Sequence, residues 1–349
     1  MKERLVFSSV TRISDLSERS LSTVRVPTAD WRNGDYVVGE VVSGALARPL
    51  ELCNGRTVEL FEGELVVGAL GRRHATLEAT GTWEGVGDDG RMAILTRGGV
   101  FGRITSLSTL MSAFPEIEYR GHLLADGERS SMGLYVRGTG LEPTSAFAIP
   151  TILVLGTSMS TGKTTVVRVL VRLLRAGGLR VLGAKLTGAG HYRDILTMAD
   201  AGADPVLDFV DVGLPSTVVP VEEYGPALGS LLTRMESSGA DVAAVEVGAS
   251  PLEPYNGEAA IQMIRDAVRF IVLCASDPYA ARGFMEAYPL PVDLVTGTAA
   301  NTLAGVELIG RLSGLPALDL RDRSTWPEAA RMLNAKLDLE LPFSAARRE

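Results

Sequence analysis

After Pro150 the chain alternates between short apolar runs and amphipathic stretches of helical length. Six apolar runs predict buried strands, at residues 151–156, 179–186, 242–248, 270–276, 292–298 and 315–320. Between them, amphipathic stretches predict helices over 162–176, 222–238, 257–268, 301–313 and 326–338. Continuous apolar strands separated by helices are typical of an α/β fold with a mostly parallel sheet covered on both faces. Right-handed crossovers then bring the carboxyl ends of the strands, and any ligand, to one edge.

Residues 24–137 have a different pattern, in which short apolar runs are separated by glycine. Runs at 36–44, 57–71, 75–85 and 92–102 predict the strands of a meander or a small barrel, and 107–113 predicts a helix. We therefore expect four parts: a polar arm or short helix (1–23), a smaller β-rich domain in the position of a substrate cap (24–137), a linker with glycine and proline (138–150) and the α/β domain (151–349).

Composition and charge narrow the range of possible functions. The length of 349 residues suits two domains, and a net charge of −8 without a basic stripe predicts no nucleic-acid partner. The first residues lack the apolar segment of a signal peptide and no run reaches 18 apolar residues, so we expect a cytoplasmic protein without a membrane span. Cys53 and Cys274 lie far apart in strand-like runs, which predicts reduced core thiols and no soft-metal cluster.

The first predicted strand runs directly into a loop rich in glycine and threonine, and then into an amphipathic stretch. This strand–loop–helix context is the one that a phosphate-binding P-loop requires. Backbone N–H groups would hold phosphate oxygens, Lys163 would reach the β- and γ-phosphates, and the Thr164 hydroxyl would bind Mg²⁺. The alternative is a strand-to-helix turn that contains Gly-Lys-Thr by chance. The cofactor-binding candidates in the loop are Gly156, Thr157, Ser160, Thr161, Gly162, Lys163, Thr164 and Thr165.

The loop departs from the common P-loop spacing, because five residues separate Gly156 from Gly162 and Thr157 stands in the place of the first consensus glycine. In this form, Gly-Thr-x-x-x-x-Gly-Lys-Thr, it resembles the loop of dethiobiotin synthetase and its relatives, including the ATP-dependent cobyrinate amidases. It is also similar to a less-characterised P-loop family that includes acyltransferases acting on amino-acid amines. Partner-activated ATPases of this class carry an early lysine where this chain has Ser158, which disfavours a dimerisation-switched ATPase.

The resemblance covers about residues 150–320 and implies further site residues. Lys185 falls on a lysine that, in the synthetases, holds the transferring phosphoryl group or the substrate carboxylate, and Thr187 lies near a hydroxyl position of that family. Glu246 resembles the glutamate that serves the metal, and an acid at the end of an apolar strand follows the general Walker B logic. Asn301 falls on an asparagine that contacts the nucleotide base. The alternative interpretations are that Lys185 is an exposed loop residue, that the Glu246 carboxylate caps a helix, and that Asn301 is an ordinary N-cap.

The loop after the second strand offers acids and cations. Asp194 is favoured over Asp200 as a Mg²⁺ ligand because it lies nearer the strand end. His191 and Arg193 either meet an anionic substrate or are surface residues.

The β-rich part contains no known motif. Arg72, Arg73 and His74 stand together at a strand-to-turn junction, as an anion clamp or, in the favoured interpretation, as a solvated hairpin tip. The same alternatives apply to Arg103, and His122 is interpreted as a packed or surface histidine.

These observations predict an ATP- and Mg²⁺-dependent enzyme of ligase or kinase type, which activates a small acid or an amino-acid-like metabolite. Lys163, Lys185 and Glu246 would act in catalysis, and Thr164, Asp194 and Glu246 would hold the metal. The guanine-reading motif Asn-Lys-x-Asp is absent, which favours ATP over GTP. The alternatives are an acyltransferase that holds acyl-CoA phosphates in the P-loop, and a nucleotide-switched binding or metallochaperone-like protein. The resembling synthetases form dimers, so we expect a homodimer.

Overall fold

The computed structural model describes residues 4–44, 48–136 and 146–341. The chain divides into two compact units. The first contains Met1–Gly140, Gly188–Arg193 and Phe209–Leu231, and the second contains Leu141–Thr187, Asp194–Asp208 and Leu232–Glu349. Two segments from the second half of the chain thus belong to the first unit, where Ala189 bridges Ser216 and the Thr96 hydroxyl donates to the Gly190 carbonyl. The predicted linker lies outside the described residues up to position 145.

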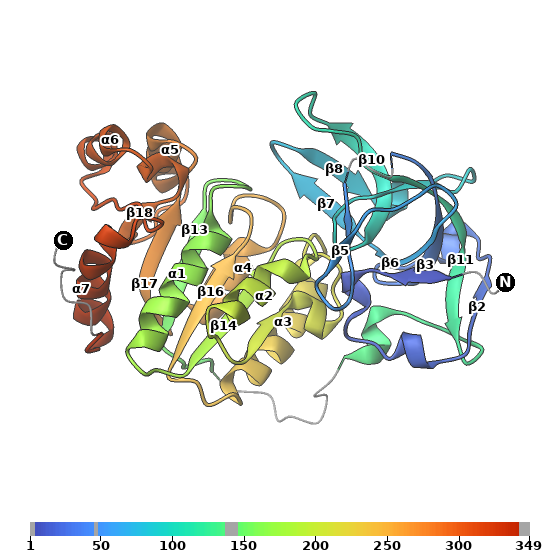
Figure 1. Ribbon diagram of the computed structural model, residues 1–349, viewed down its shortest axis with the longest axis horizontal. Coiled ribbons are helices and arrows are strands. Elements are labelled where there is room, and N and C mark those ends of the chain that lie inside the picture. Colours follow the sequence, from blue (N-terminus) through green and yellow to red (C-terminus); the bar gives the residue numbers. More distant parts are fainter. Residues whose placement is uncertain (1–3, 45–47, 137–145, 342–349) are drawn as a thin grey trace. The chain divides into compact units, whose positions relative to one another are not determined.

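The first unit is built on a ten-stranded sheet. Its strands are β1 (Leu5–Phe7), β2 (Leu21–Val24), β3 (Tyr36–Ser43), β6 (Leu65–Leu70), β7 (Arg72–Ala75), β8 (Ala79–Thr82), β9 (Arg91–Ile94), β10 (Val100–Leu107), β11 (Glu116–Ala125) and β12 (Glu128–Arg129). The pairings β6–β3–β11–β9–β10–β6 form a closed ring, which is the small barrel that the glycine-separated runs predict (Figure 1). Two short strands, β4 (Leu50–Glu51) and β5 (Thr57–Val58), pair separately.

Two predictions for the first half are wrong. The described residues 4–23 are not an arm, because β1 pairs with β6 and β2 with β11. The alternative of a short helix is met only by two three-residue 3-10 helices, at Ser9–Thr11 and Leu16–Glu18. Val10 and Leu16, each 1% exposed, anchor the segment between these strands in the core. The predicted helix over 107–113 does not form: β10 continues to Leu107, and Leu110 is 92% exposed. An amphipathic helix needs a core to cover its apolar face, and this segment has none.

The second unit contains a six-stranded parallel sheet in the order β15–β14–β16–β13–β17–β18. The strands are β13 (Thr151–Gly156), β14 (Val181–Thr187), β15 (Val206–Asp208), β16 (Val242–Val247), β17 (Val268–Cys274) and β18 (Leu294–Thr296). Every residue of β13, β14 and β16 is buried, as expected for central strands covered on both faces. The predicted strand over 315–320 is reduced to one bridge between Ala317 and Val295, and β15 was not predicted.

The amphipathic pattern predicts five of the helices, α1 (Lys163–Ala176), α3 (Val221–Glu236), α4 (Gly257–Ile264), α6 (Leu303–Ser313) and α7 (Trp326–Leu337); α2 (Tyr192–Asp200) and α5 (Pro278–Ala287) were not predicted. Of these, α1, α4 and α7 pack on the strands of this sheet, and most of α3 belongs to the first unit. The crossover from β13 to β14 and that from β16 to β17 run in opposite directions along the sheet. Right-handed crossovers therefore place α1 and α4 on opposite faces. The second unit has the architecture of a P-loop NTPase domain, with all strand carboxyl ends at one edge (Figure 1).

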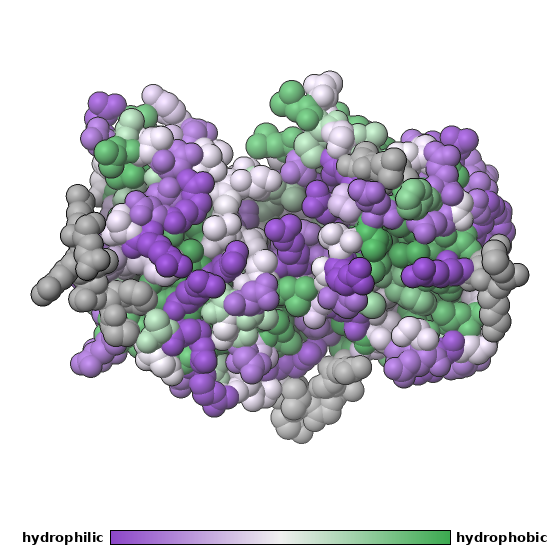
Figure 2. Space-filling view, viewed as in Figure 1, coloured by the Kyte–Doolittle hydropathy of each residue, from purple (hydrophilic) through white to green (hydrophobic). Residues whose placement is uncertain are grey.

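The surface is mixed in character. On the face drawn in Figure 2, hydrophilic and hydrophobic residues are interspersed over both units. Among the described residues, none of the helices combines the length and the apolar composition that a membrane crossing requires.

Candidate phosphate-binding site

The loop between β13 and α1 has the backbone geometry of a phosphate-binding loop. Ser160 and Gly162 adopt positive φ angles of 61° and 95°, so the chain curls before the helix begins at Lys163. The Lys163 ammonium turns back and donates to the Ser158 carbonyl at 2.7 Å. It crosses Gly156 so closely that a Cβ there would lie 2.5 Å from Nζ and 2.8 Å from the Thr161 hydroxyl. A Cβ at position 156 would therefore displace the Lys163 side chain and the Thr161 hydroxyl from these positions.

Thr157, which stands in the place of the first consensus glycine, anchors the loop. Its N–H donates to the Cys274 carbonyl at 3.0 Å, and its hydroxyl accepts from the Ser276 N–H at 3.2 Å. The side chain thus fastens the loop to the end of β17, which a glycine could not do. On the same side, a Cβ on Gly297 would lie 2.4 Å from the Thr161 carbonyl, so the loop after β18 packs directly on the P-loop.

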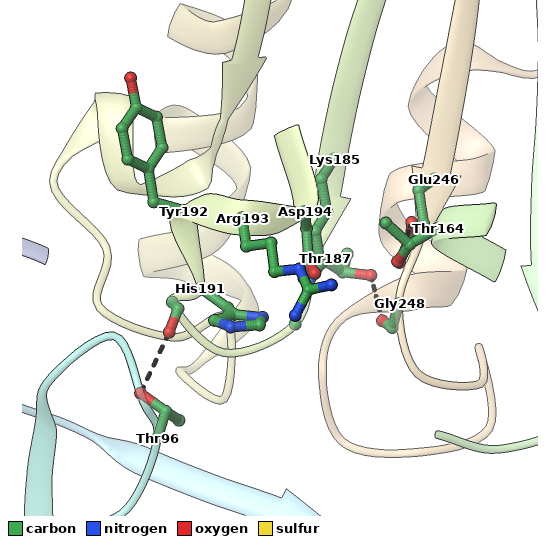
Figure 3. Close-up of polar contacts among 12 residues, drawn as sticks. Thr96, Thr164, Lys185, Thr187, His191, Tyr192, Arg193, Asp194, Glu246 and Gly248 are labelled. Atoms are coloured by element: carbon green, nitrogen blue, oxygen red, sulfur yellow. Dashed lines mark hydrogen bonds and ion pairs between the residues drawn. The ribbon is translucent and has the colours of Figure 1, made fainter. Parts of the chain in front are cut away.

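The structure brings Thr164 and Glu246 together. The Thr164 hydroxyl donates to Glu246 Oε2 at 3.1 Å, from the first turn of α1 to the carboxyl end of β16 (Figure 3). Glu246 is 2% exposed, and burial raises the pKa of its carboxyl although the ammonium groups of Lys185 and Lys163 act in the opposite direction. A hydroxyl and a buried carboxylate beside the first turn of the helix are the arrangement that Mg²⁺ in a P-loop site uses.

Two buried lysines flank this carboxylate. Lys163 and Lys185 are each 7% exposed. Burial lowers the pKa of Lys163, and the Glu246 carboxylate opposes the shift. Burial alone would also lower the pKa of Lys185, but the carboxylates of Asp194 and Glu246 raise it above its ordinary value. Both lysines are thus held close to the same carboxylate.

Asp194 forms a short ion pair with Lys185, from the first turn of α2 to the end of β14 (Figure 3). This pairing was not foreseen from the sequence, which suggested a metal ligand. Asp200 is exposed at the last residue of the same helix. A metal role for Asp194 stays a prediction, and among the described residues no group of three or more His, Cys, Asp or Glu side chains is arranged to hold an ion.

Thr187 has a structural contact of its own. Its hydroxyl donates to the Gly248 carbonyl (Figure 3), and a Cβ on Gly248 would lie 3.0 Å from the Thr187 carbonyl. The two residues hold the ends of β14 and β16 together, and Val247 between Glu246 and Gly248 points into the core with no exposed surface. The glycine displaced by one position is thus explained by strand packing.

The remaining candidates in this unit lie at its surface. Thr165 and Ser160 are exposed. Asn301 is exposed as well, and it is not the N-cap of α6, because the Thr302 side chain accepts from the Gly305 N–H. Asn301 follows the loop whose Gly297 packs on Thr161, so a nucleotide contact by Asn301 stays a prediction.

The predicted loop residues His191 and Arg193 belong to the first unit, where Glu51 holds them. The buried Glu51 carboxylate accepts the N–H groups of Tyr192 and Arg193, both at 2.7 Å, and lies 3.7 Å from His191 Nε2. Sequence reasoning missed Glu51, although an acid inside the apolar segment Pro-Leu-Glu-Leu was a signal that it has a buried partner.

The basic residues of the first unit do not form the solvated hairpin tip that the sequence predicts. Arg72, Arg73 and His74 lie within β7, and Arg73 is 7% exposed, with its guanidinium bound to the Leu95 carbonyl and to Glu78. The solvated interpretation is therefore wrong for Arg73, because its position in the barrel wall turns it inward. Three other polar side chains have protein partners: Arg72 pairs with Glu84, Arg103 with Asp89, and the fully buried His122 contacts Tyr119 and Asp35.

The cysteine prediction holds for one residue. Cys274 at the end of β17 is fully buried, and burial raises the pKa of its thiol to about 12. Cys53 is exposed, because it follows the two-residue strand β4 in a turn and has no core against which to pack.

Comparisons with known proteins do not assign a family to the chain. No protein-family model matches the chain, and no curated protein matches it. Among solved structures, the signal recognition particle receptor FtsY from Elizabethkingia anophelis is 16% identical, with 54% of this chain and 62% of that chain covered and a TM-score of 0.32. The hydrogenase maturation factor HypB from Archaeoglobus fulgidus is 14% identical, with 54% and 89% covered and a TM-score of 0.37.

A DUF1611 family protein from Anabaena variabilis is 16% identical, with 58% of this chain and 63% of that chain covered and a TM-score of 0.34. The chain spans less than two thirds of the FtsY and DUF1611 structures. Because all three TM-scores lie below 0.5, we draw no conclusion about function from them.

Proposed function

We propose that the second unit binds Mg·ATP at Gly156–Thr165 and transfers its terminal phosphoryl group to a small acid or amino-acid-like metabolite, as ligases and kinases do. One observation carries the proposal: the contact between the Thr164 hydroxyl and the buried Glu246 carboxylate, with two buried lysines beside it. A loop that binds only the phosphates of coenzyme A has no need of a paired metal site, whereas Mg·triphosphate does.

The phosphates would lie against the start of α1. The helix N-terminus and the curled backbone at Ser160 and Gly162 supply N–H groups and partial positive charge for phosphate oxygens. Lys163 would exchange its hydrogen bond to the Ser158 carbonyl for one to a phosphate oxygen. This exchange replaces a neutral acceptor with a charged one, which makes a stronger hydrogen bond to an ammonium group.

The residues present fit a magnesium ion. Thr164 and Glu246 supply two oxygen donors side by side, and phosphate oxygens and water would complete the six that Mg²⁺ requires. When bound, the ion would neutralise charge on the β- and γ-phosphates.

Lys185 gives the site a capacity for transfer beyond binding. It lies at the carboxyl end of β14, in register with Glu246 on the neighbouring β16. Asp194 orients it and keeps it charged. A fixed, buried cation close to a triphosphate site stabilises the charge that develops on a transferring phosphoryl group. The resemblance of this lysine to that of the synthetases supports a small acid as the acceptor, and supports a homodimer as the assembly.

The test is turnover. The full chain is incubated with Mg·ATP and a panel of small carboxylic acids and amino acids, and ADP and new phosphorylated or conjugated products are measured. We expect ADP formation that depends on one acceptor class and is lost in Lys163→Ala and Lys185→Met. The absence of ADP with every acceptor would refute the transfer reaction.

Two further arms identify the nucleotide and the alternative chemistry. Replacing ATP with GTP tests the base preference, for which the absent guanine motif predicts ATP. Thermal shifts measured with acyl-CoA esters test the acyltransferase alternative, because a ligand stabilises the fold according to its affinity. Stronger stabilisation by acyl-CoA than by Mg·ATP would favour that alternative over the proposal.

A further inference from the structure

Two turns of the first unit carry three exposed leucines, which we call the leucine tip: Leu77, Leu107 and Leu110. They are 63%, 41% and 92% exposed, and no other large hydrophobic residue in the described part of the chain is as exposed as Leu110. Leu77 lies in the turn between β7 and β8, and Leu107 ends β10 just before the turn that contains Leu110. The two turns are neighbours, because Leu107 pairs with Ala79 and the Ser108 N–H donates to the Glu78 carbonyl at 2.8 Å. The β7–β8 turn and the end of β10 project from the barrel in Figure 1, and hydrophobic residues lie over them in Figure 2.

The longer of the two turns has no charge that would resist transfer from water to lipid. Every residue of the segment 104–115, with the sequence ITSLSTLMSAFP, is uncharged. An uncharged loop with apolar side chains enters the boundary between lipid headgroups and acyl chains readily, whereas a charged side chain is costly there. Phe61 of the same unit offers the contrast: it is 61% exposed, but Glu62 follows it directly and its N–H donates to the Glu64 carboxylate at 2.9 Å.

Arginines lie directly behind both turns. Arg48 donates to the carbonyl of Ser112, two residues after Leu110, at 3.2 Å. Arg73 pairs with Glu78, the residue that follows Leu77. The guanidinium carbons of Arg48 and Arg73 lie 3.8 Å and 5.3 Å from the centre of the same phenylalanine ring, at position 114. The apolar turns and the guanidinium groups therefore belong to one surface feature.

The positive charge behind the leucine tip exceeds the negative charge. The pKa of Arg48 is lowered by burial and then by the charge of Arg73, with a smaller effect of Arg97, while Glu78 acts in the opposite direction. Neither Arg48 nor Arg97 forms an ion pair with a described residue. Three arginines, which we call the arginine cluster (Arg48, Arg73 and Arg97), thus share one carboxylate, and the net charge is +2 (3 − 1).

We propose that the leucine tip inserts into the surface of an anionic lipid bilayer, with the arginine cluster at the level of the headgroups. Peripheral binding of this kind gains from buried apolar area and from attraction to anionic lipid, and the two turns with their arginines supply both. Three leucines offer far less than the about 800 Å² that each partner contributes to a stable protein interface, so a second copy of the chain is not the favoured occupant. This membrane-docking role belongs to the first unit and goes beyond the proposed phosphoryl transfer.

The test is sedimentation of the full chain with vesicles of phosphatidylcholine alone or of phosphatidylcholine with phosphatidylserine, at low and at high chloride concentration. Leu110→Ser removes apolar surface from the leucine tip, and Arg97→Gln removes a charge from the arginine cluster. Both side chains are exposed, so both variants should melt as the wild type does. The controls are Phe61→Ser, an equally apolar exposed position beside carboxylates, and Arg172→Gln, an exposed arginine of α1 without a partner among the described residues.

We expect the wild-type chain to sediment with the phosphatidylserine vesicles, more weakly with phosphatidylcholine alone, and more weakly at high chloride, which screens the arginines. Leu110→Ser should weaken the partition about tenfold, and Arg97→Gln about fivefold. Phe61→Ser and Arg172→Gln should bind as the wild type does. No association with phosphatidylserine vesicles at low chloride, or equal losses in the controls, would overturn the proposal.

Sedimentation velocity without lipid tests the alternative occupant. A wild-type dimer that Leu110→Ser dissociates would assign the leucine tip to a second copy of the chain and would overturn membrane docking. An unchanged association state in Leu110→Ser, together with the loss of vesicle binding, supports it. Both measurements are made without nucleotide, so their outcome is independent of the proposed phosphoryl transfer.

Discussion

Replacing Lys185 with methionine tests the buried charge arrangement of the second unit. Methionine keeps an unbranched side chain only one atom shorter than lysine and removes its charge. It would leave Asp194 without its ion-pair partner and Glu246 without the lysine that acts more strongly on its pKa. The Lys185 side chain is 9% exposed and that of Asp194 is 15% exposed, so water compensates little.

The expected loss is large. Removing one partner of a buried ion pair costs about 3–5 kcal/mol, because a carboxylate is left buried and unpaired. For a domain of this size each kcal/mol lowers Tm by about 2–4 °C, which gives a decrease of about 6–20 °C. Lys336→Met is the matched control, since Lys336 pairs with Asp293 while its side chain is 55% exposed. A pair at the surface should contribute at most about 1 kcal/mol.

The pH dependence follows from the raised pKa of Lys185. A lysine whose pKa is higher in the folded state stabilises the fold fully below its unfolded value of about 10.4, and the contribution is lost only above that, as pH rises through the folded value. The deficit of Lys185→Met should therefore persist at pH 9. It should shrink at pH 5, where the carboxylates left behind can take up protons.

Scanning calorimetry of wild type, Lys185→Met, Asp194→Asn and the double variant completes the test. The double variant should be less destabilised than the sum of the two single variants, because the second change removes the carboxylate that the first left unpaired. A decrease in Tm below about 2 °C for Lys185→Met, or strictly additive effects, would refute the reasoning.

Two further predictions concern the loop and the thiols. Gly156→Ala should abolish stabilisation by Mg·ATP while the fold is retained, because the added Cβ would displace Lys163. The control is Gly283→Ala, whose added Cβ would have nothing within 4 Å. Equal nucleotide-dependent thermal shifts in the two variants would contradict the geometry. A thiol reagent at pH 8 should label Cys53 alone in the native chain and both cysteines after denaturation, since Cys274 is buried with a pKa of about 12. Rapid native labelling of Cys274 would contradict its burial.

Much of the second unit could be predicted because its signals are local. The apolar strands are buried on both faces and lack polar interruptions, so their positions are visible in the sequence. The P-loop was predicted from its glycine, lysine and threonine residues between a predicted strand and a predicted helix. The helix α2 was missed because the polar segment at its start gains its acceptor from Glu51, far away in the chain. The strand over 315–320 was predicted from hydropathy, but only Ala317 pairs there.

The contacts of the candidate site depended on partners that sequence does not reveal. The sequence pattern predicted that Thr164, Glu246 and Lys185 lie at one edge of a parallel sheet. It did not predict that Lys185 pairs with Asp194 or that Thr157 anchors the loop. In the first unit, the short apolar runs predicted the barrel. That residues 188–193 and 209–231 belong to this unit follows from long-range packing, which the sequence does not reveal. Arg48 and Arg73 both approach the Phe114 ring although the three residues are well separated in sequence, so only the structure brings them together.

Isothermal titration of Mg·ATP into the full chain and into Lys163→Ala tests the central claim most directly. The wild-type chain should bind the nucleotide in a magnesium-dependent manner, with affinity reduced when EDTA is present. Lys163→Ala should keep the calorimetric melting of the fold and lose at least about tenfold in affinity, because a charge-assisted hydrogen bond to phosphate is removed. Equal affinity of Mg·ATP for wild type and Lys163→Ala would contradict the assignment of Gly156–Thr165 as the triphosphate site.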